Sequence, residues 1–222
     1  MVERAGEAAE LRAGAAELGV DLAPERAQAL LDFRDLVARW NSAVNLVSRR
    51  DIHRLVPRHL LDSLTVVPWL CGHRTLDVGT GAGFPGVPLA IAREDVHFTL
   101  IDSSERKIRF VNRAVRALGL TNVTALCADV RALAAEARFD TVVCRGVGDP
   151  ASLWALAGPR VAPEGRMVIM SRTGAASAAK GNPPLPEDVC LEGRHGVRIP
   201  DLEHTHELTL LRHRAATTGE AC

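Results

Sequence analysis

Residues 76–90 read LDVGTGAGFPGVPLA, and this glycine-rich stretch decides how the rest of the chain is interpreted. Its apolar beginning predicts a short buried strand, and its apolar end predicts a helix, with a loop of glycines between them. Glycines let a backbone adopt positive φ and approach a ligand closely. The stretch therefore predicts a ligand-binding loop after the first strand of an α/β sheet, where such sheets bind ligands.

The chain changes its pattern just before this loop. Up to about residue 70 the apolar spacing predicts helices at 3–18, from Pro24 to about residue 40, and at 57–70, with a polar turn at 41–51. From Arg74 onward, short apolar segments alternate with helical ones, which is typical of a parallel sheet with helices on both faces. The predicted parallel strands cover 74–79, 96–102, 122–129, 139–146 and 166–171.

Two further strands, near 189–198 and 206–213, predict an antiparallel hairpin added to this sheet, and the stretch 173–188 predicts a loop. We therefore expect a Rossmann-like, doubly wound core over residues 73–222, preceded by an N-terminal helical annex over residues 1–72.

The composition is that of an ordinary globular protein, and it indicates neither a disulfide framework nor a metal site. The 222 residues carry 27 basic and 27 acidic side chains, so any nucleic-acid-binding surface has to be local. Five cysteines without a C-x-x-C pattern argue against a disulfide framework and against a zinc site. We interpret four C-terminal histidines as surface residues: His195, His204, His206 and His213. With no secretory signal and no apolar run of membrane-spanning length, we expect a cytoplasmic protein.

The glycines of the loop fit two ligand patterns. Gly81, Gly83 and Gly86 spell G-x-G-x-x-G, the pattern of dinucleotide-binding loops. If the pattern is read from one glycine earlier, Gly79, Gly81 and Gly83 spell G-x-G-x-G, and Gly79 lies two positions after the acidic residue Asp77. A dinucleotide brings an anionic pyrophosphate to the helix N-terminus. S-adenosylmethionine brings a sulfonium cation and no phosphate, so it tolerates an acid there.

We favour the methyl donor for this reason, and because Phe84 and Pro85 add bulk where a dinucleotide loop stays small. A dinucleotide remains the alternative. Asp102 ends the second strand, about twenty residues after the loop, where a carboxylate can accept the hydroxyls of a ribose. This acid fits either ligand.

The end of the fourth strand carries the chemistry that the acceptor would meet. Arg145 is the only charge that ends this apolar strand, which favours a functional role. The preceding Cys144 is interpreted as a buried strand thiol. No general base stands out, which suits a nucleophile with a free lone pair, such as guanine N7. Such a reaction depends mostly on positioning.

Six stretches follow one another along the chain: RWNSAVNLVS (39–48), RHLLDSL (58–64), LDVGTGAGFPGVPLAI (76–91), TLIDSSERKIRFV (99–111), LGLTNV (118–123) and FDTVVCR (139–145). Together they resemble one family, the bacterial 16S rRNA guanine-N7 methyltransferases known as RsmG or GidB. The resemblance implies a class I methyltransferase fold and methylation at N7 of a guanine in small-subunit rRNA. It implies donor contacts at Gly79 and Phe84, an adenine contact at Val130 and Arg131, and Arg145 near the donor or the target base.

We expect S-adenosylmethionine to be the donor and 16S rRNA or the small ribosomal subunit to be the partner. We also expect the enzyme to be a monomer. The donor-binding candidates are Asp77, Gly79, Gly81, Phe84, Asp102, Val130, Arg131 and Arg145, and Arg145 is also the catalytic candidate. The RNA-binding candidates are Asn45, Arg58, His59, Arg106, Lys107 and Arg172.

The sequence departs from the family at two places that bear on the substrate. Asp129-Val130-Arg131 replaces the usual Arg-[Ala/Val]-Glu, and Ser171-Arg172 replaces Lys-Gly. Three other functions therefore stay open: a family member that methylates a small molecule or peptide, an rRNA-binding protein without turnover, and, more distantly, an NAD-dependent oxidoreductase.

Overall fold

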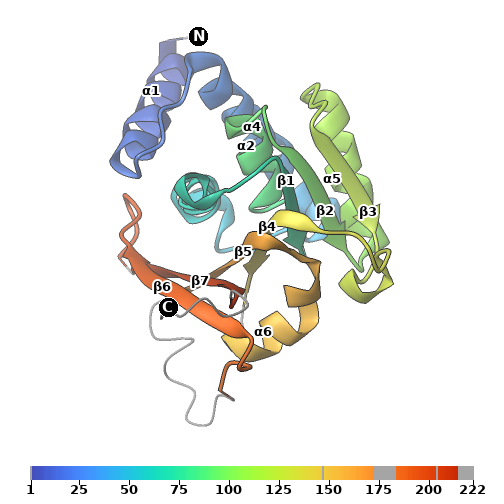
Figure 1. The fold of residues 1–222 in the computed structure, drawn as a ribbon. Helices are drawn as coiled ribbons and strands as arrows, with labels where there is room; N and C mark the ends of the chain where they lie inside the picture. Colours follow the sequence, from blue (N-terminus) through green and yellow to red (C-terminus); the bar gives the residue numbers. More distant parts are fainter. Residues whose placement is uncertain (1, 147, 173–183, 204, 215–222) are drawn as a thin grey trace.

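The computed structural model describes residues 2–146, 148–172, 184–203 and 205–214, and gathers their strands into one seven-stranded sheet (Figure 1). The strand order is β3-β2-β1-β4-β5-β7-β6. The strands are β1 (Arg74–Val78), β2 (His97–Asp102), β3 (Val123–Cys127), β4 (Phe139–Arg145), β5 (Val161–Arg172), β6 (Val189–Val197) and β7 (His206–His213).

Strands β1 to β5 run parallel, and β7 pairs antiparallel with both β5 and β6. The register places Val78 of β1 opposite Ile101 of β2 and opposite Cys144 of β4. Asp102 and Arg145, the next residues on β2 and β4, therefore lie at the same carboxyl edge of the sheet. The structure confirms the predicted doubly wound core with an antiparallel hairpin.

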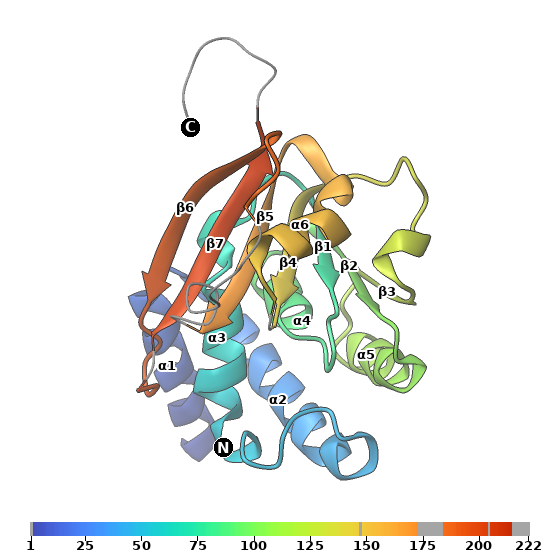
Figure 2. The same cartoon turned by 90° about the horizontal axis from the view of Figure 1, so that it is seen from below.

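Helices cover both faces of this sheet (Figures 1 and 2). Helices α4 and α5 lie on one face together with the N-terminal helices, and α6 lies on the other. The α-helices are α1 (Val2–Glu17), α2 (Pro24–Val44), α3 (Asp62–Leu64), α4 (Gly86–Ala92), α5 (Glu105–Ala117) and α6 (Pro150–Ala157). The short segments are η1 (Ile52–Arg54), η2 (Val56–Leu61), η3 (Val67–Trp69), η4 (Val130–Ala132) and η5 (Gly158–Arg160).

Alternating side chains of β4 explain why both faces are covered. Val143 belongs to the hydrophobic cluster beneath the N-terminal helices, whereas Val142 and Cys144 belong to the cluster beneath α6. All three are buried, as expected for a strand in the middle of a parallel sheet. The first cluster also contains Phe33 of α2, so the helical segment and the sheet share one apolar core. The division at residues 72 and 73 stays a prediction.

Two helical predictions need correction. Helix α2 continues past residue 40 to Val44, because Val44 is buried, and it ends at Asn45 with a left-handed φ of 51°. The helix predicted over 57–70 is divided into the π-helical η2, one turn of α3 and the 3-10 segment η3. In this region the Ser63 hydroxyl donates to the carbonyl of His59, a side-chain bond that competes with regular helix pairing.

Other differences are smaller. Strand β5 begins at Val161, five residues earlier than predicted, with an irregular register against β4. Only residues 184–188 of the predicted loop at 173–188 lie within the described part of the chain. Cys190 is disulfide-bonded, which the cysteine pattern did not predict, whereas Cys71, Cys127 and Cys144 are free. No helix within the described residues is long and apolar enough to cross a membrane.

Candidate functional site

The loop between β1 and α4 forms the floor of the candidate site. Gly79, Gly81 and Gly83 have φ values of 73°, 60° and 93°, a region that residues with a Cβ seldom occupy. The amides of Gly79 and Thr80 both donate to the carbonyl of Ile101 at 2.9 Å, which ties the loop to β2. A Cβ built on Gly79 would meet nothing within 4 Å. The loop backbone is therefore open on that side to a ligand.

The last glycine of the loop serves a different purpose. A Cβ on Gly86 would collide with the side chain of Leu100 and would lie 2.7 Å from Oδ2 of Asp77. Gly86 thus lets α4 start close against the sheet. The G-x-G-x-x-G match ends on this packing position, whereas Gly79, where a Cβ would meet nothing, belongs only to the frame that begins there.

Asp77 lies buried beneath the loop, with 1 % of its surface exposed. Its Oδ2 accepts a hydrogen bond from the Gly86 amide at 2.9 Å, and its Oδ1 has no hydrogen-bond partner among the described atoms. Burial raises the pKa of Asp77 to about 6, against the nearby Thr80 hydroxyl and Gly86 amide, which lower it. At neutral pH this is a carboxylate that a nearby cation would stabilise.

Asp102 joins the loop to the next strand. Its Oδ2 accepts from the Gly81 amide at 2.9 Å, and its Oδ1 accepts from the Ser104 amide at 2.8 Å. The ammonium of Lys107 lies 3.9 Å from Oδ2. Each oxygen of a carboxylate has two lone pairs, so Asp102 can still accept hydroxyl groups while it holds the loop.

Arg145 extends from the end of β4 towards the helical segment that carries the H-x-x-D-S-L motif. Its Nη2 lies 3.0 Å from Oδ2 of Asp62 and donates to the carbonyl of Arg58 at 2.9 Å. Its guanidinium carbon lies 6.0 Å from the centre of the Phe84 ring. The side chain of Arg145 is thus fixed beside the glycine loop, with 21 % of it exposed.

Asp62 is bound on its other oxygen by a residue from the C-terminal hairpin. The Nδ1 of His206 on β7 lies 2.6 Å from Oδ1 of Asp62, and Asp62 is 2 % exposed. The interpretation of His206 as a surface residue is therefore wrong. His195 packs on the Trp69 ring and His213 on that of Trp154. His204 lies outside the described residues.

The sequence made His59 an RNA-binding candidate, but its side chain is buried in the structure. It is 9 % exposed, and its ring lies 4.8 Å from that of Phe84. Burial and the nearby Arg145 lower the pKa of His59 to about 4, so its imidazole is neutral at physiological pH. Neither ring nitrogen has a hydrogen-bond partner among the described atoms.

The other candidates divide between the site and the surface. Val130 is buried after β3, while Arg131 is exposed beside Asp129. Asn45 and Arg106 are exposed, and Arg58 is paired with Asp51 at 2.7 Å. The side chain of Arg172 lies outside the described part of the structure.

Cys144 is buried, as predicted, and burial raises the pKa of its thiol to about 12. A thiolate nucleophile at this position is therefore excluded at neutral pH. No group of three His, Cys, Asp or Glu side chains within the described residues is arranged to hold a metal ion.

Sequence reasoning assigned no role to Asp62 or His206. Asp62 left a usable signal, because it is the single acid in the apolar helical stretch HLLDSL, which belongs to one of the stretches that carry the family resemblance. A buried acid needs a partner. His206 left none, since its partner lies 144 positions earlier in the chain.

Comparisons with known proteins identify the family of this chain. The family model described as GidB, rRNA small subunit methyltransferase G, matches residues 26–182. The "Ribosomal RNA small subunit methyltransferase G" of Laribacter hongkongensis is 36% identical over 208 residues, which cover 91% of this chain and 96% of that protein. The protein of the same name from Yersinia pestis is 37% identical over 202 residues, covering 87% and 93%.

Solved structures with the same fold are methyltransferases of distant sequence. The glycopeptide N-methyltransferase MtfA, complexed with S-adenosylmethionine, matches with a TM-score of 0.56 at 12% identity, over 70% of this chain and 87% of that one. The ribosomal protein L11 methylase of Lactobacillus delbrueckii subsp. bulgaricus matches with a TM-score of 0.52 at 10% identity, over 71% and 79%. These likenesses show the fold.

Proposed function

The chain belongs to the GidB family, rRNA small subunit methyltransferase G, and from this premise we propose which residues hold the methyl donor and which face the RNA. As a member it is an S-adenosylmethionine-dependent methyltransferase of 16S rRNA, and the acceptor is N7 of a guanine. This assignment replaces the small-molecule, peptide and dinucleotide alternatives that the sequence alone left open.

The residues at the carboxyl edge of the sheet fit this donor. The open backbone at Gly79 and Gly81 leaves space where any other residue would place a side chain. The unpartnered oxygen of Asp77, two residues before Gly79, supplies buried negative charge at this loop, which suits a cationic ligand better than a pyrophosphate. Asp102 accepts ribose hydroxyls with its remaining lone pairs. This combination of open glycines over a buried acid is the observation that carries the proposal.

The donor supplies a methyl group on a positively charged sulfur, and guanine N7 attacks it with a lone pair that carries no proton. The protein therefore needs no general base, and its residues act by orientation and by excluding water. Phe84, held between Phe33 and His59 with ring centres 5.1 and 4.8 Å away, provides an apolar wall at the loop. The neutral imidazole of His59 adds no charge to it.

Arg145 is the residue that we place next to the acceptor guanine. Its guanidinium is planar and can donate to the acceptor oxygen O6 of a guanine, beside N7. Asp62 and His206 keep it in position, since Asp62 accepts from both. We class Asp62 and His206 as positioning residues and keep Arg145 as the catalytic candidate.

We assign Asn45, Arg58 and Arg106 to the RNA-facing surface, with Lys107 beside the donor. Arg172 stays a candidate on its sequence position alone. We propose that His59 supports the Phe84 ring from below and does not touch the RNA. We keep the adenine contact at Val130 and Arg131, because η4 follows β3 at the same edge of the sheet. We also keep two predictions about the whole protein, that it acts as a monomer and that it works in the cytoplasm, where its substrate is assembled.

Methyl transfer from labelled S-adenosylmethionine tests the proposal. Small subunits and naked 16S rRNA are prepared from a strain that lacks the enzyme, and label in a guanine is the expected result. Donor binding is measured in parallel by calorimetry. Binding of NAD without binding of S-adenosylmethionine would overturn the donor assignment, and label in another base would overturn the acceptor assignment.

A further inference from the structure

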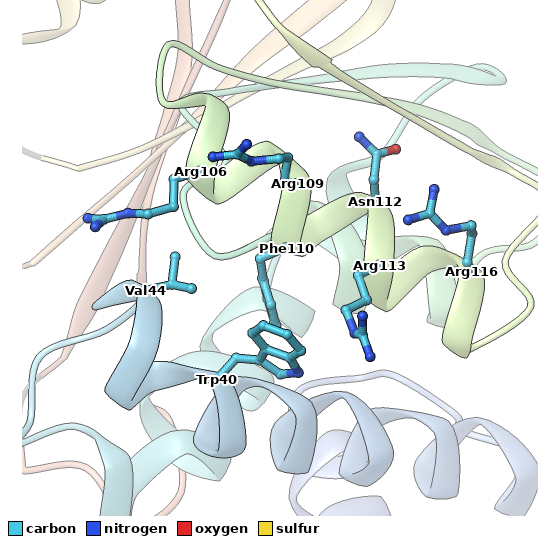
Figure 3. A pocket seen from close by; sticks show the side chains of 8 residues that line it. All are labelled: Trp40, Val44, Arg106, Arg109, Phe110, Asn112, Arg113 and Arg116. Carbon is cyan, nitrogen blue, oxygen red and sulfur yellow. The ribbon is translucent and has the colours of Figure 1, made fainter.

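A groove between α2 and α5, separate from the glycine loop, carries an unusual concentration of arginine. Its volume is about 690 Å³ (Figure 3). Figure 3 shows Trp40 and Val44 on α2 facing a row of side chains on α5. The residues that line the groove are Trp40, Val44, Arg106, Arg109, Phe110, Asn112, Arg113 and Arg116.

The four arginines form one stripe along α5. They are spaced by three, four and three residues, which places them on one side of a helix. Ten residues of helix rise by about 15 Å, so the stripe is longer than a single phosphate requires. All four side chains are exposed. The stripe matches the dimensions of an extended anionic strand.

Acidic side chains do not neutralise this stripe. Among the described residues, Arg106, Arg113 and Arg116 have no ion pair within 4.0 Å, and Arg109 has only Glu105 at 3.8 Å, with both side chains largely exposed. Such an exposed pair is worth little. In a chain with equal numbers of basic and acidic residues, this is a local excess of positive charge.

One of the four arginines, Arg113, also has a structural role. The guanidinium carbon of Arg113 lies 4.6 Å from the centre of the Trp40 ring, which links α5 to α2. Arg109 and Arg116 have no such contact among the described residues. Within the described part of the chain, Arg116 has no ion pair and Arg109 has only its exposed pair with Glu105, so these are the positions at which a test does not disturb the packing.

We propose that the arginine stripe of α5 binds the phosphate backbone of the rRNA strand that leads to the donor site. The stripe begins at Arg106, four residues after Asp102, so its near end adjoins the donor-binding edge of the sheet. The arginines hold the phosphates of an RNA strand that lies along the stripe, without recognising its bases. These backbone contacts position the target guanine at the donor site. This inference rests on the proposed function for the identity of the strand.

The test compares one double variant of the full-length protein with two control double variants and with the wild type, using naked 16S rRNA as the probe. Arg109→Gln/Arg116→Gln removes two phosphate contacts, and Arg109→Lys/Arg116→Lys keeps their charge. Arg138→Gln/Arg212→Gln removes two exposed arginines at the opposite edge of the sheet, where β4 begins and β7 ends. Thermal unfolding and donor binding are measured for every variant to show that the fold and the donor site are intact.

The salt dependence of RNA binding gives the readout. Each single-strand phosphate contact contributes about 0.7 to the slope of log K against log salt, so the Gln variant should lose about 1.4. Its KM for RNA should rise on the order of tenfold with kcat unchanged, while the Lys variant and the control pair keep the wild-type slope.

A wild-type slope and KM in the Gln variant would overturn the proposal, as would an equal loss in the Arg138/Arg212 control. If the stripe bound a partner protein and not RNA, the Gln variant would keep the wild-type salt dependence of RNA binding. That result would also overturn the proposal. If the wild-type protein transferred no methyl group to 16S rRNA, the proposed function would fail, while the binding slope would still decide the role of the stripe.

Discussion

Asp62 and Arg145, 83 positions apart in the sequence, are joined by an ion pair of 3.0 Å at a buried carboxylate. His206 holds the second oxygen of the same carboxylate at 2.6 Å. One acid thus connects a helical turn, the end of β4 and the C-terminal hairpin. The arrangement gives the hairpin a role at the site, since it fixes the side chain that we place next to the acceptor base.

Asp62→Asn should weaken both the fold and the reaction. Removing one partner of a buried pair leaves the other charge poorly compensated, and we expect a loss of about 3 kcal/mol in the free energy of unfolding. We also expect kcat to fall at least tenfold because Arg145 loses its orientation. Denaturant unfolding and single-turnover transfer measure the two effects. Asp95→Asn, in an exposed pair with Arg93, is the control and should change stability by less than about 1 kcal/mol.

His206 allows a finer test of positioning. The side-chain amide of asparagine can occupy the place of Nδ1 and donate to Asp62, whereas alanine cannot. We therefore expect His206→Asn to retain most of kcat and His206→Ala to lose about as much as Asp62→Asn. Equal activity of the two His206 variants would show that the bond to Asp62 has no part in the reaction.

Asp102→Ala should weaken donor binding at least tenfold. It removes the acceptor for ribose hydroxyls and also releases the Gly81 amide from its bond. Calorimetric titration with S-adenosylmethionine measures the change, and Asp149→Ala, at the start of α6 on the other face of the sheet, should bind normally. An unchanged affinity of Asp102→Ala would place the ribose elsewhere.

The raised pKa of Asp77 predicts two opposite responses to pH. In the free, folded protein the pKa of Asp77 is about 6, above its ordinary value of 3.8, so the folded state favours the protonated carboxyl group. The stabilisation from this group is therefore fully present below about pH 4 and is lost as the pH rises through 6. Asp77→Asn should remove this loss and stabilise the free protein at pH 7.5 by up to about 3 kcal/mol.

Donor affinity should change in the other direction. Only the ionised carboxylate attracts a cationic donor, so the affinity of the wild-type protein should rise with pH up to about 6 and then level off. Calorimetry between pH 5 and 7 measures this rise, which Asp77→Asn should lack. A pH-independent affinity of the wild-type protein would rule out this electrostatic role.

Two glycine substitutions separate packing from binding. Gly86→Ala places a methyl group against Leu100 and Asp77, and we expect a loss of about 1–3 kcal/mol in stability, the usual range for overpacking. Gly79→Ala meets open space and costs about 1 kcal/mol for its positive φ, but its methyl group enters the donor space. It should abolish donor binding in a folded protein. Tight binding by Gly79→Ala would contradict the open side of the loop.

The sequence predicted those parts of the molecule that depend on local pattern. Alternation of apolar segments revealed the sheet, and the acid before Gly79 identified the donor, because both signals lie within a few neighbouring residues. The division of the 57–70 helix was not predictable from spacing, since it accompanies a hydroxyl bond between Ser63 and His59.

Long-range contacts explain the remaining errors. His59 was placed on the surface because it lies among arginines in the sequence, yet the helix turns it under Phe84. The partner of His206 is set by the pairing of β7 with β5, which brings it to the edge where Asp62 lies. Residues joined over such separations leave no periodic signal.

Mapping the methylated base shows directly whether the protein transfers a methyl group to guanine N7 of 16S rRNA. The protein is incubated with S-adenosylmethionine and with small subunits or 16S rRNA from a strain that lacks the enzyme, and the modified nucleotide is identified by mass spectrometry. We expect a single 7-methylguanine in 16S rRNA, and we expect it to be strongly reduced with Arg145→Ala. A methyl group on another base or atom, or donor binding without any transfer to 16S rRNA, would contradict this expectation.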